Sequence, residues 1–241
     1  LPIPHGEAAL DALPVLERAL AGGSPVRPHE AGTTPDPLPR HDAPLPDDLA
    51  VVVGTSGSTG TPKLAMLGAQ ALAASAAATH DRLGGPGQWL LALPPHHVAG
   101  LQVLLRSIHA GTRPVVADPG LTPFALVEAV AAMSGERRYA SLVPAQLATM
   151  AADPMGLEGL RRLDAVLVGG AAAPPQVVAA AREAGVRVVL TYGMSETCGG
   201  CVYDGRALSG VDAAVDEDGT LVLGGPVVAH GYLGQPELTT T

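Results

Sequence analysis

The chain has 241 residues, of which 47% are hydrophobic and 15% charged, so it can bury a sizeable core and lacks the composition of a disordered protein. A net charge of −9 and an aromatic content of 2% argue against a nucleic-acid-binding surface. No run approaches the ~20 apolar residues of a membrane-spanning helix, and no signal peptide is visible. We therefore expect a cytoplasmic globular protein with small-molecule partners and no membrane insertion; a homodimer is left open.

The N-terminal part predicts one amphipathic helix and then a linker. Residues 8–21 place Leu10, Leu13, Leu16 and Leu20 near one helical face. Residues 22–48 are dense in Pro, Gly, Thr and Asp, which is typical of a linker or an irregular surface segment. We expect residues 1–48 to form a helix and Pro-rich linker that precede the core.

Strand and helix patterns then alternate. Strands are predicted over residues 49–53, 88–93, 112–117, 139–143, 163–168 and 186–191, and helices over 68–82, 98–110, 123–133, 144–152 and 174–184. This alternation predicts an α/β fold with largely parallel sheets covered by helices over residues 49–191. Residues 192–241 predict a smaller β-rich part of the same domain, with short antiparallel strands over 201–203, 210–215 and 220–223.

A glycine-rich loop, Gly54–Lys63, follows the first core strand. Its glycines let the backbone approach a ligand, and its hydroxyls and one ammonium suit phosphate oxygens. Lys63 is the only lysine of the chain. The loop also leaves the carboxyl end of a predicted strand, where open α/β sheets bind ligands. It is not a P-loop, because Pro62 separates Lys63 from the last glycine and the following residues favour a strand over a helix.

Four segments, in order over residues 51–239, resemble the motifs of the adenylate-forming superfamily, which includes acyl-CoA synthetases. The segments are Thr55–Lys63, Gly169–Pro174, Thr191–Glu196 and Gly231–Thr239. Ser58 and Ser195 stand where threonine is common, and Leu64 stands where glycine is usual. Members of this superfamily use ATP and Mg²⁺ to convert a carboxylic acid to an acyl-adenylate, which a thiol, usually coenzyme A, then attacks.

The resemblance implies a set of site residues. It implies catalytic roles for His97, Glu196 and Lys63, with Glu196 as the Mg²⁺ ligand. The implied ATP-binding residues are Thr55, Ser56, Gly57, Ser58, Thr59, Gly60, Lys63, Gly170, Ala171, Tyr192 and Ser195. The implied acyl-binding residues are His97, Gly100, Arg106, Gly169, Gly170, Gly193 and Met194.

Two segments resemble one subfamily in particular, the o-succinylbenzoate–CoA ligases of menaquinone biosynthesis. They are His96–Gly100, with the sequence His-His-Val-Ala-Gly, and Val202–Val211. The expected substrate is then an aromatic dicarboxylate, whose second carboxylate needs a cationic or hydrogen-bonding partner. Arg106, on the helix that follows His97, is the first candidate for that partner.

The resemblance ends just past Thr239, before the superfamily's ribose-binding Asp and its small C-terminal domain. We therefore expect a truncated form with weak nucleotide or acyl-adenylate binding and very low ligase activity. Two alternatives stay open: another aryl- or fatty-acyl-CoA ligase, and a non-catalytic nucleotide-binding module derived from a ligase domain. Cys198 and Cys201 are expected to be reduced cysteines rather than zinc ligands, because further ligands are not evident.

Overall fold

A seven-stranded sheet forms the centre of the fold. The computed structural model describes residues 1–41, 43–55, 63–117 and 120–239. The sheet has the order β11-β10-β9-β8-β7-β5-β6. Its parallel strands are β5 (Gln88–Leu91), β6 (Val115–Val116), β7 (Arg138–Leu142), β8 (Ala165–Val168) and β9 (Val188–Met194), and the antiparallel edge is β10 (Gly199–Tyr203) and β11 (Arg206–Ala207). The predicted α/β class with a largely parallel sheet is confirmed.

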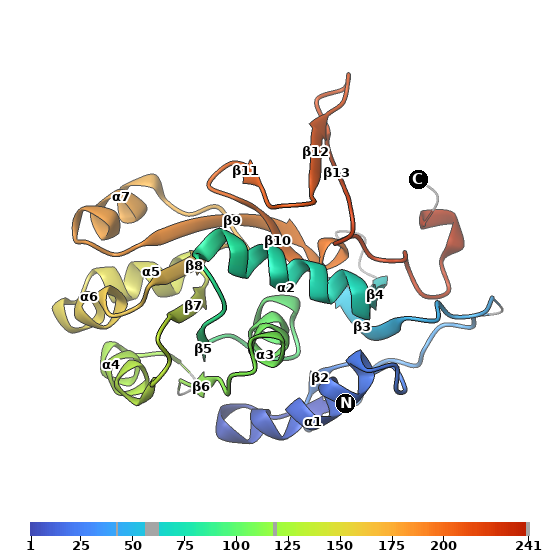
Figure 1. Ribbon diagram of the computed structural model, residues 1–241, viewed down its shortest axis with the longest axis horizontal. Helices are drawn as coiled ribbons and strands as arrows, with labels where there is room; N and C mark the ends of the chain where they lie inside the picture. The colour runs from blue at the N-terminus through green and yellow to red at the C-terminus, as the bar shows by residue number, and fades with distance from the viewer. Residues whose placement is uncertain (42, 56–62, 118–119, 240–241) are drawn as a thin grey trace.

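Helices cover both faces of this sheet (Figure 1). The helices α2 (Ala69–Leu83) and α3 (Val98–Ala110) pack on one face, and α4 (Pro123–Ala132), α5 (Pro144–Ala151), α6 (Pro154–Arg161) and α7 (Pro175–Glu183) on the other. Side chains alternate between the two cores along each strand, so that Trp89 faces α2 and α3 while its neighbour Leu90 faces the opposite core. Both faces are therefore buried, as a parallel sheet requires.

Proline begins several of these helices. Pro123, Pro144, Pro154 and Pro175 occupy the first turn of α4, α5, α6 and α7, where the missing N–H costs nothing and the fixed φ suits the helix. Most helices match the predicted ranges within a few residues. Helix α6 was not predicted; its two glycines lower helix propensity, and they are tolerated because Gly159 packs closely against Leu126 of α4.

The first predicted core strand lies outside the parallel sheet. Strands β3 (Leu49–Thr55) and β4 (Lys63–Gly68) form a separate antiparallel pair, in which Thr55 is opposite Lys63. Strand β3 does end at the glycine-rich loop, as expected, but the expectation that this strand belongs to the parallel sheet is wrong. Periodicity could not reveal this, because a strand buried on both sides, as β3 is over its first five residues, has the same apolar sequence in either kind of sheet.

The N-terminal segment packs against this body. The predicted helix divides into a 3₁₀ helix, η1 (Gly6–Ala12), and α1 (Leu13–Leu20), with a proline at the start of α1. The following segment is mostly irregular, as predicted, but its residues His29–Glu30 (β2) pair in parallel with Pro2–Ile3 (β1). Within the described residues no helix is long and apolar enough to cross a membrane.

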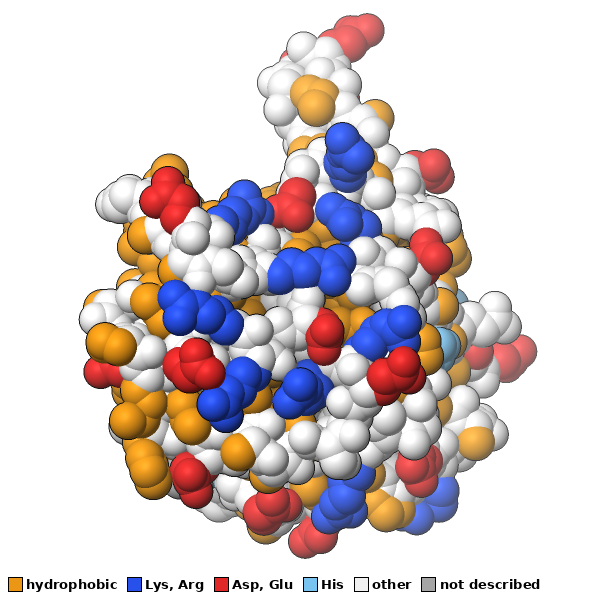
Figure 2. Space-filling view, turned by 60° about the vertical axis from the view of Figure 1, so that its left-hand side comes forward, with side chains coloured by type: hydrophobic (Ala, Val, Ile, Leu, Met, Phe, Trp, Pro, Cys, Tyr) orange, Lys and Arg blue, Asp and Glu red, His pale blue; other side chains and the backbone are white. Residues whose placement is uncertain are grey.

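The C-terminal part is β-rich, as predicted. After the 3₁₀ turn η2 (Ser195–Thr197) and β10, the antiparallel pair β12 (Asp212–Val215) and β13 (Leu221–Gly224) projects from the body (Figure 1), and a final 3₁₀ turn, η3, covers Pro236–Leu238. On the face toward α4–α7, basic side chains are interspersed with acidic ones (Figure 2), so that face carries no field of a single sign.

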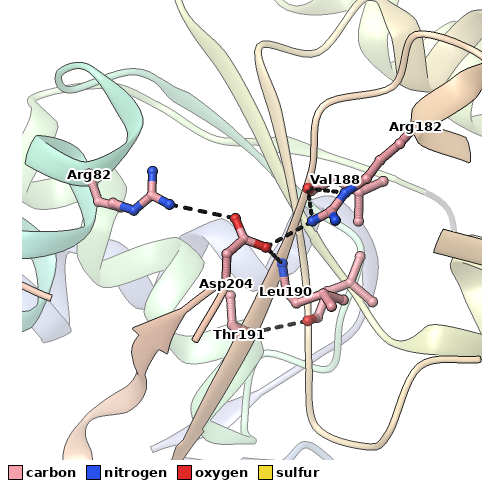
Figure 3. A network of polar contacts seen from close by, with 7 residues as sticks. Arg82, Arg182, Val188, Leu190, Thr191 and Asp204 are labelled. Atoms are coloured by element: carbon pink, nitrogen blue, oxygen red, sulfur yellow. Dashed lines mark hydrogen bonds and ion pairs between the residues drawn. The ribbon is translucent and has the colours of Figure 1, made fainter. Parts of the chain in front are cut away.

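Asp204 anchors the antiparallel edge of the sheet (Figure 3). Its carboxylate accepts hydrogen bonds from Arg182 Nη2 at 2.8 Å and from the Leu190 amide at 3.0 Å, and Arg82 Nη2 lies 3.5 Å from its other oxygen. Asp204 has a φ of +48°, a left-handed conformation that Asp tolerates better than most residues. These contacts join α2, α7 and β9 at the turn that follows Tyr203.

Candidate functional site

A pocket opens at the carboxyl ends of the parallel strands. Its lining comes from the ends of β7, β8 and β9, the loop after β5, and from α3 and β10. It brings together five of the seven predicted acyl-binding residues, namely Arg106, Gly169, Gly170, Gly193 and Met194. The pocket therefore lies at the edge where open α/β sheets bind ligands, beside the strands of the parallel sheet and not beside β3. We call this cavity the acyl pocket, after the predicted residues that line it.

Arg106 lies in the wall of the acyl pocket and is only 3% exposed. Its guanidinium carbon is 5.1 Å from the centre of the Trp89 ring, and its Nη2 donates a long hydrogen bond of 3.4 Å to Tyr203 Oη. Its Nε has no hydrogen-bond partner, and none of the ion pairs among the described residues includes it. A guanidinium stays protonated in proteins, so the pocket wall carries a buried positive charge without an anion.

Neutral groups surround this charge. The Tyr203 hydroxyl lies 3.1 Å from Thr79 Oγ1, and Trp89 Nε1 donates to His80 Nε2 at 3.2 Å. Burial, then the charges of Arg106 and His109, lower the pKa of His80 from 6.5 to about 4. His80 is therefore neutral at pH 7, and Arg106 is the cation of this part of the pocket.

The glycine-rich loop is described only at its two ends. Thr55 and Lys63 are cross-strand partners at the adjacent ends of β3 and β4. The predicted phosphate-binding residues Ser56, Gly57, Ser58, Thr59 and Gly60 lie outside the described residues. The Lys63 ammonium is 5.2 Å from the centre of the Tyr232 ring.

Glu196 lies in η2, directly after strand β9. Tyr232 Oη donates a hydrogen bond of 2.6 Å to Glu196 Oε1, and the Ala229 amide donates to the Glu196 carbonyl at 2.7 Å. Burial and the Glu196 carboxylate raise the pKa of Tyr232 to about 12. The predicted metal ligand is thus a half-buried carboxylate that already has one partner from the chain's last motif.

A second, more open hollow adjoins the acyl pocket, because Val98 lines both. Thr55, Ser195, His96 and His97 line this hollow, so three predicted site residues meet there. His97 precedes the first residue of α3 and is exposed. It does not line the acyl pocket, which is where the resemblance implied a role for it.

Gly100 does not line the acyl pocket either. A Cβ at this position would overlap the Pro94 carbonyl, so the glycine allows the first turn of α3 to pack on the preceding loop. Tyr192 and Ala171 are both exposed at the ends of β9 and β8, where a flat ligand would have access to them.

Cys198 and Cys201 are free and buried behind the acyl pocket. Burial, with a smaller contribution from Cys201, raises the pKa of Cys198 to about 12, which disfavours the reactive thiolate. The Cys198 carbonyl accepts hydrogen bonds from Ser75 Oγ and Gln102 Nε2, so this segment holds the pocket wall in place. Within the described residues, no cluster of three or more His, Cys, Asp or Glu side chains could hold a metal by itself.

Several residues of the site were not predicted from the sequence. They are Thr79, Trp89, Gln102 and Tyr203 around Arg106, and Tyr232 beside Glu196. One signal was available: the chain has one Trp and four Tyr, so each aromatic with a polar atom is rare here. Their partners are distant in sequence, however, and only the fold brings them together.

Comparisons with known proteins identify the family of the chain. The family model of the AMP-binding enzymes matches residues 4–233. A probable 2-succinylbenzoate–CoA ligase of Mycobacterium tuberculosis H37Rv is 49% identical over 237 residues, which are 96% of this chain and 62% of that protein. The 2-succinylbenzoate–CoA ligase of Escherichia coli K12 is 37% identical over 153 residues, or 63% of this chain and 31% of that one. The chain thus spans less than two thirds of the length of these relatives.

Solved structures show the same fold. O-succinylbenzoate coenzyme A synthetase (MenE) of Bacillus subtilis, in complex with AMP, matches with a TM-score of 0.70 and 26% identity, covering 80% of this chain and 55% of that one. Wild-type E. coli MenE, with a bound analogue of OSB-AMS, matches with a TM-score of 0.63 and 30% identity, covering 78% and 42%. With its ordered motifs and a family match that leaves out only eleven residues at the ends, 1–3 and 234–241, the chain belongs to the AMP-binding enzyme family.

Proposed function

We propose that this chain is the nucleotide- and acid-binding part of an AMP-forming acid–thiol ligase that acts on o-succinylbenzoate. The observation that carries the proposal is the buried Arg106 charge in the wall of the acyl pocket. A buried cation would destabilise a pocket for a fatty acid, because an ion without a counter-charge costs several kcal/mol of folding free energy. A dicarboxylic acid offers one carboxylate for activation and a second to pair with this cation.

The acid chemistry follows from where the groups lie. The distal carboxylate pairs with Arg106, and the Tyr203 hydroxyl beside it can donate a further hydrogen bond. The aromatic ring lies between the glycine-lined ends of β8 and β9, and the reacting carboxylate points toward the hollow lined by Thr55 and Ser195. One carboxylate oxygen attacks the α-phosphorus of ATP, and pyrophosphate leaves with the bridging oxygen. The thiol sulfur of coenzyme A then attacks the acyl carbon and releases AMP.

ATP binding divides between two groups of residues. Thr55, Ser56, Gly57, Ser58, Thr59, Gly60 and Lys63 bind the β- and γ-phosphates. Gly170, Ala171 and Tyr192 lie against the adenine, and Ser195 contacts the α-phosphate. Support comes from the pairing of Thr55 with Lys63 on adjacent strands, and from the hollow that Thr55 and Ser195 both line. His97 borders the same hollow, so we place it where the acyl-adenylate forms.

Magnesium fits Glu196 as a ligand shared with the nucleotide. A single half-exposed carboxylate is too little to hold the ion alone. Mg²⁺ commonly takes one or two carboxylates and completes its shell with water and substrate phosphates. Bound in this way, the ion would neutralise phosphate charge during the attack.

The proposed organisation keeps residues 1–48 as an N-terminal segment, 49–191 as the ATP- and acid-binding core, and 192–241 as a β-rich part of the same domain. A cytoplasmic location and a homodimer remain expectations. Ligase activity of the whole protein also rests on the relatives, because the chain spans 62% of the M. tuberculosis ligase. Another aryl-CoA ligase is the second candidate, favoured only if a monocarboxylic acid serves equally well.

Calorimetric titration tests the proposal. The non-reactive sulfamate analogue of o-succinylbenzoyl-adenylate is compared with the analogues of benzoyl- and decanoyl-adenylate. We expect the dicarboxylic analogue to bind at least about tenfold more tightly, because it alone pairs with Arg106. Equal binding of all three would refute the assignment of the acid. Failure of all three to bind would refute the assignment of the site.

A further inference from the structure

Tyr232 joins two parts of the nucleotide site that are distant in sequence. Its backbone lies beside strand β4, through a bridge to Ala65 and a hydrogen bond from the Leu233 amide to the Leu64 carbonyl at 2.9 Å. The segment around Tyr232 therefore runs antiparallel along β4, the strand that begins with Lys63.

The Tyr232 side chain points from this segment to Glu196. The distance of 2.6 Å between Tyr232 Oη and Glu196 Oε1 is that of a charge-assisted hydrogen bond, which is stronger than one between neutral groups. The Ala229 amide holds the Glu196 carbonyl from the same segment. Both the backbone and one carboxylate oxygen of Glu196 are thus held, and Oε2 remains the oxygen that can face a cation.

The face of the Tyr232 ring also contacts Lys63. The ammonium lies 5.2 Å from the ring centre, within the range of a cation–π interaction. One side chain therefore touches the cation expected to hold the outer phosphates and the anion expected to hold the metal. The hydroxyl contacts Glu196 and the ring contacts Lys63, so substitution can separate the two contacts.

We propose that Tyr232 is a positioning residue of the nucleotide site, which orients the Glu196 carboxylate for the metal and the Lys63 ammonium for phosphate. The inference rests on the proposed function, because it assigns Glu196 to Mg²⁺. An unheld glutamate must lose its rotamer freedom when it binds a metal, and this loss weakens binding. Tyr232 bears this cost in the folded protein, before the nucleotide arrives.

The test measures ATP binding by calorimetry, once with excess Mg²⁺ and once with EDTA. Tyr232→Phe keeps the ring and removes only the hydroxyl. We expect it to raise the Kd for ATP in Mg²⁺ by about tenfold, while the Kd in EDTA stays within about twofold of the wild type. Tyr232→Leu removes the ring as well, so the Kd in EDTA should also rise, by about two- to fivefold.

Two further variants make the outcome decisive. Tyr139→Phe is the matched control, because its hydroxyl bonds to the Gly85 carbonyl far from the nucleotide, and both Kd values should stay unchanged. Glu196→Gln should lose most of the gain in ATP affinity that Mg²⁺ gives. In that background, Tyr232→Phe should cause no further loss of affinity. If Glu196→Gln keeps the gain, the metal assignment in the proposed function fails, and this inference with it.

If Glu196→Gln loses the gain but Tyr232→Phe keeps it, only the present inference is overturned. A Tyr232→Leu variant that matches the wild type in EDTA would overturn the link to Lys63. Should Tyr232→Phe fail to fold, ¹⁹F NMR of the wild-type protein with 3-fluorotyrosine at its four tyrosines decides the question. The Tyr232 resonance, assigned after phenylalanine replacement of the other three, should shift when Mg²⁺ joins the ATP complex, and an unchanged resonance would refute the inference.

Discussion

Replacing Arg106 with methionine should weaken binding of the dicarboxylic ligand without destabilising the ligand-free protein. Arg106 is 3% exposed and its guanidinium lacks an anion among the described residues. When a ligand carboxylate supplies that anion, truncating one side of the buried pair costs about 2–5 kcal/mol of binding free energy. Every 1.4 kcal/mol is about tenfold, so the Kd should rise by about 30-fold or more.

The stability of the free protein should respond differently. Methionine loses the contact of the cation with Trp89, worth up to about 2 kcal/mol of unfolding free energy when desolvated. It also removes a buried charge whose desolvation costs several kcal/mol. These contributions oppose each other, and the second is at least as large, so the urea midpoint of unfolding should be unchanged or higher.

The assay compares two acyl-adenylate analogues by calorimetry, one with a free distal carboxylate and one with that carboxylate converted to an amide. Arg106→Met should weaken the first by about 30-fold or more and the second by only a few-fold. Arg113→Met is the control, because Arg113 is exposed on the loop before β6. Equal losses for both analogues would mean that Arg106 acts through packing alone, which would refute the reasoning.

Three further predictions concern stability. The pKa of His80 in the folded protein is lowered to about 4 from 6.5, so its contribution to stability is present above pH 6.5 and is lost as the pH falls toward 4. Glutamine does not titrate, so His80→Gln should make the decline of Tm between pH 6.5 and pH 4 shallower. An unchanged decline would contradict this. Asp204→Ala should lower the free energy of unfolding by about 1–3 kcal/mol in urea titration, because its carboxylate bonds to Arg182 and to the Leu190 amide; Asp204→Asn keeps an acceptor and should lose less. Gly100→Ala should lower the free energy of unfolding by about 1–3 kcal/mol, because the added Cβ overlaps the Pro94 carbonyl. A thermal scan that matches the wild type would show that the first turn of α3 shifts to make room for the Cβ, and would contradict this prediction.

The sequence was most informative where structure depends on near neighbours. Helix α3 was predicted over its full range, because Gly111 follows it and its apolar residues recur at helical spacing. The family motifs are equally local, since each is a short run of neighbouring residues that can be recognised without the rest of the chain. The sequence by itself therefore determined the α/β class, the family resemblance and five of the residues that line the acyl pocket.

Only the tertiary structure decided which distant residues meet. Sequence spacing relates Arg106 to His97, but the fold turns Arg106 into the acyl pocket beside Tyr203 and leaves His97 in the neighbouring hollow. Strand β3 has an apolar run that suits either kind of sheet, and its pairing with β4 sets it apart from the parallel one. The contact of Tyr232 with Glu196 spans 36 residues. Such contacts form when chain segments pack together, so no periodicity or motif within one segment records them.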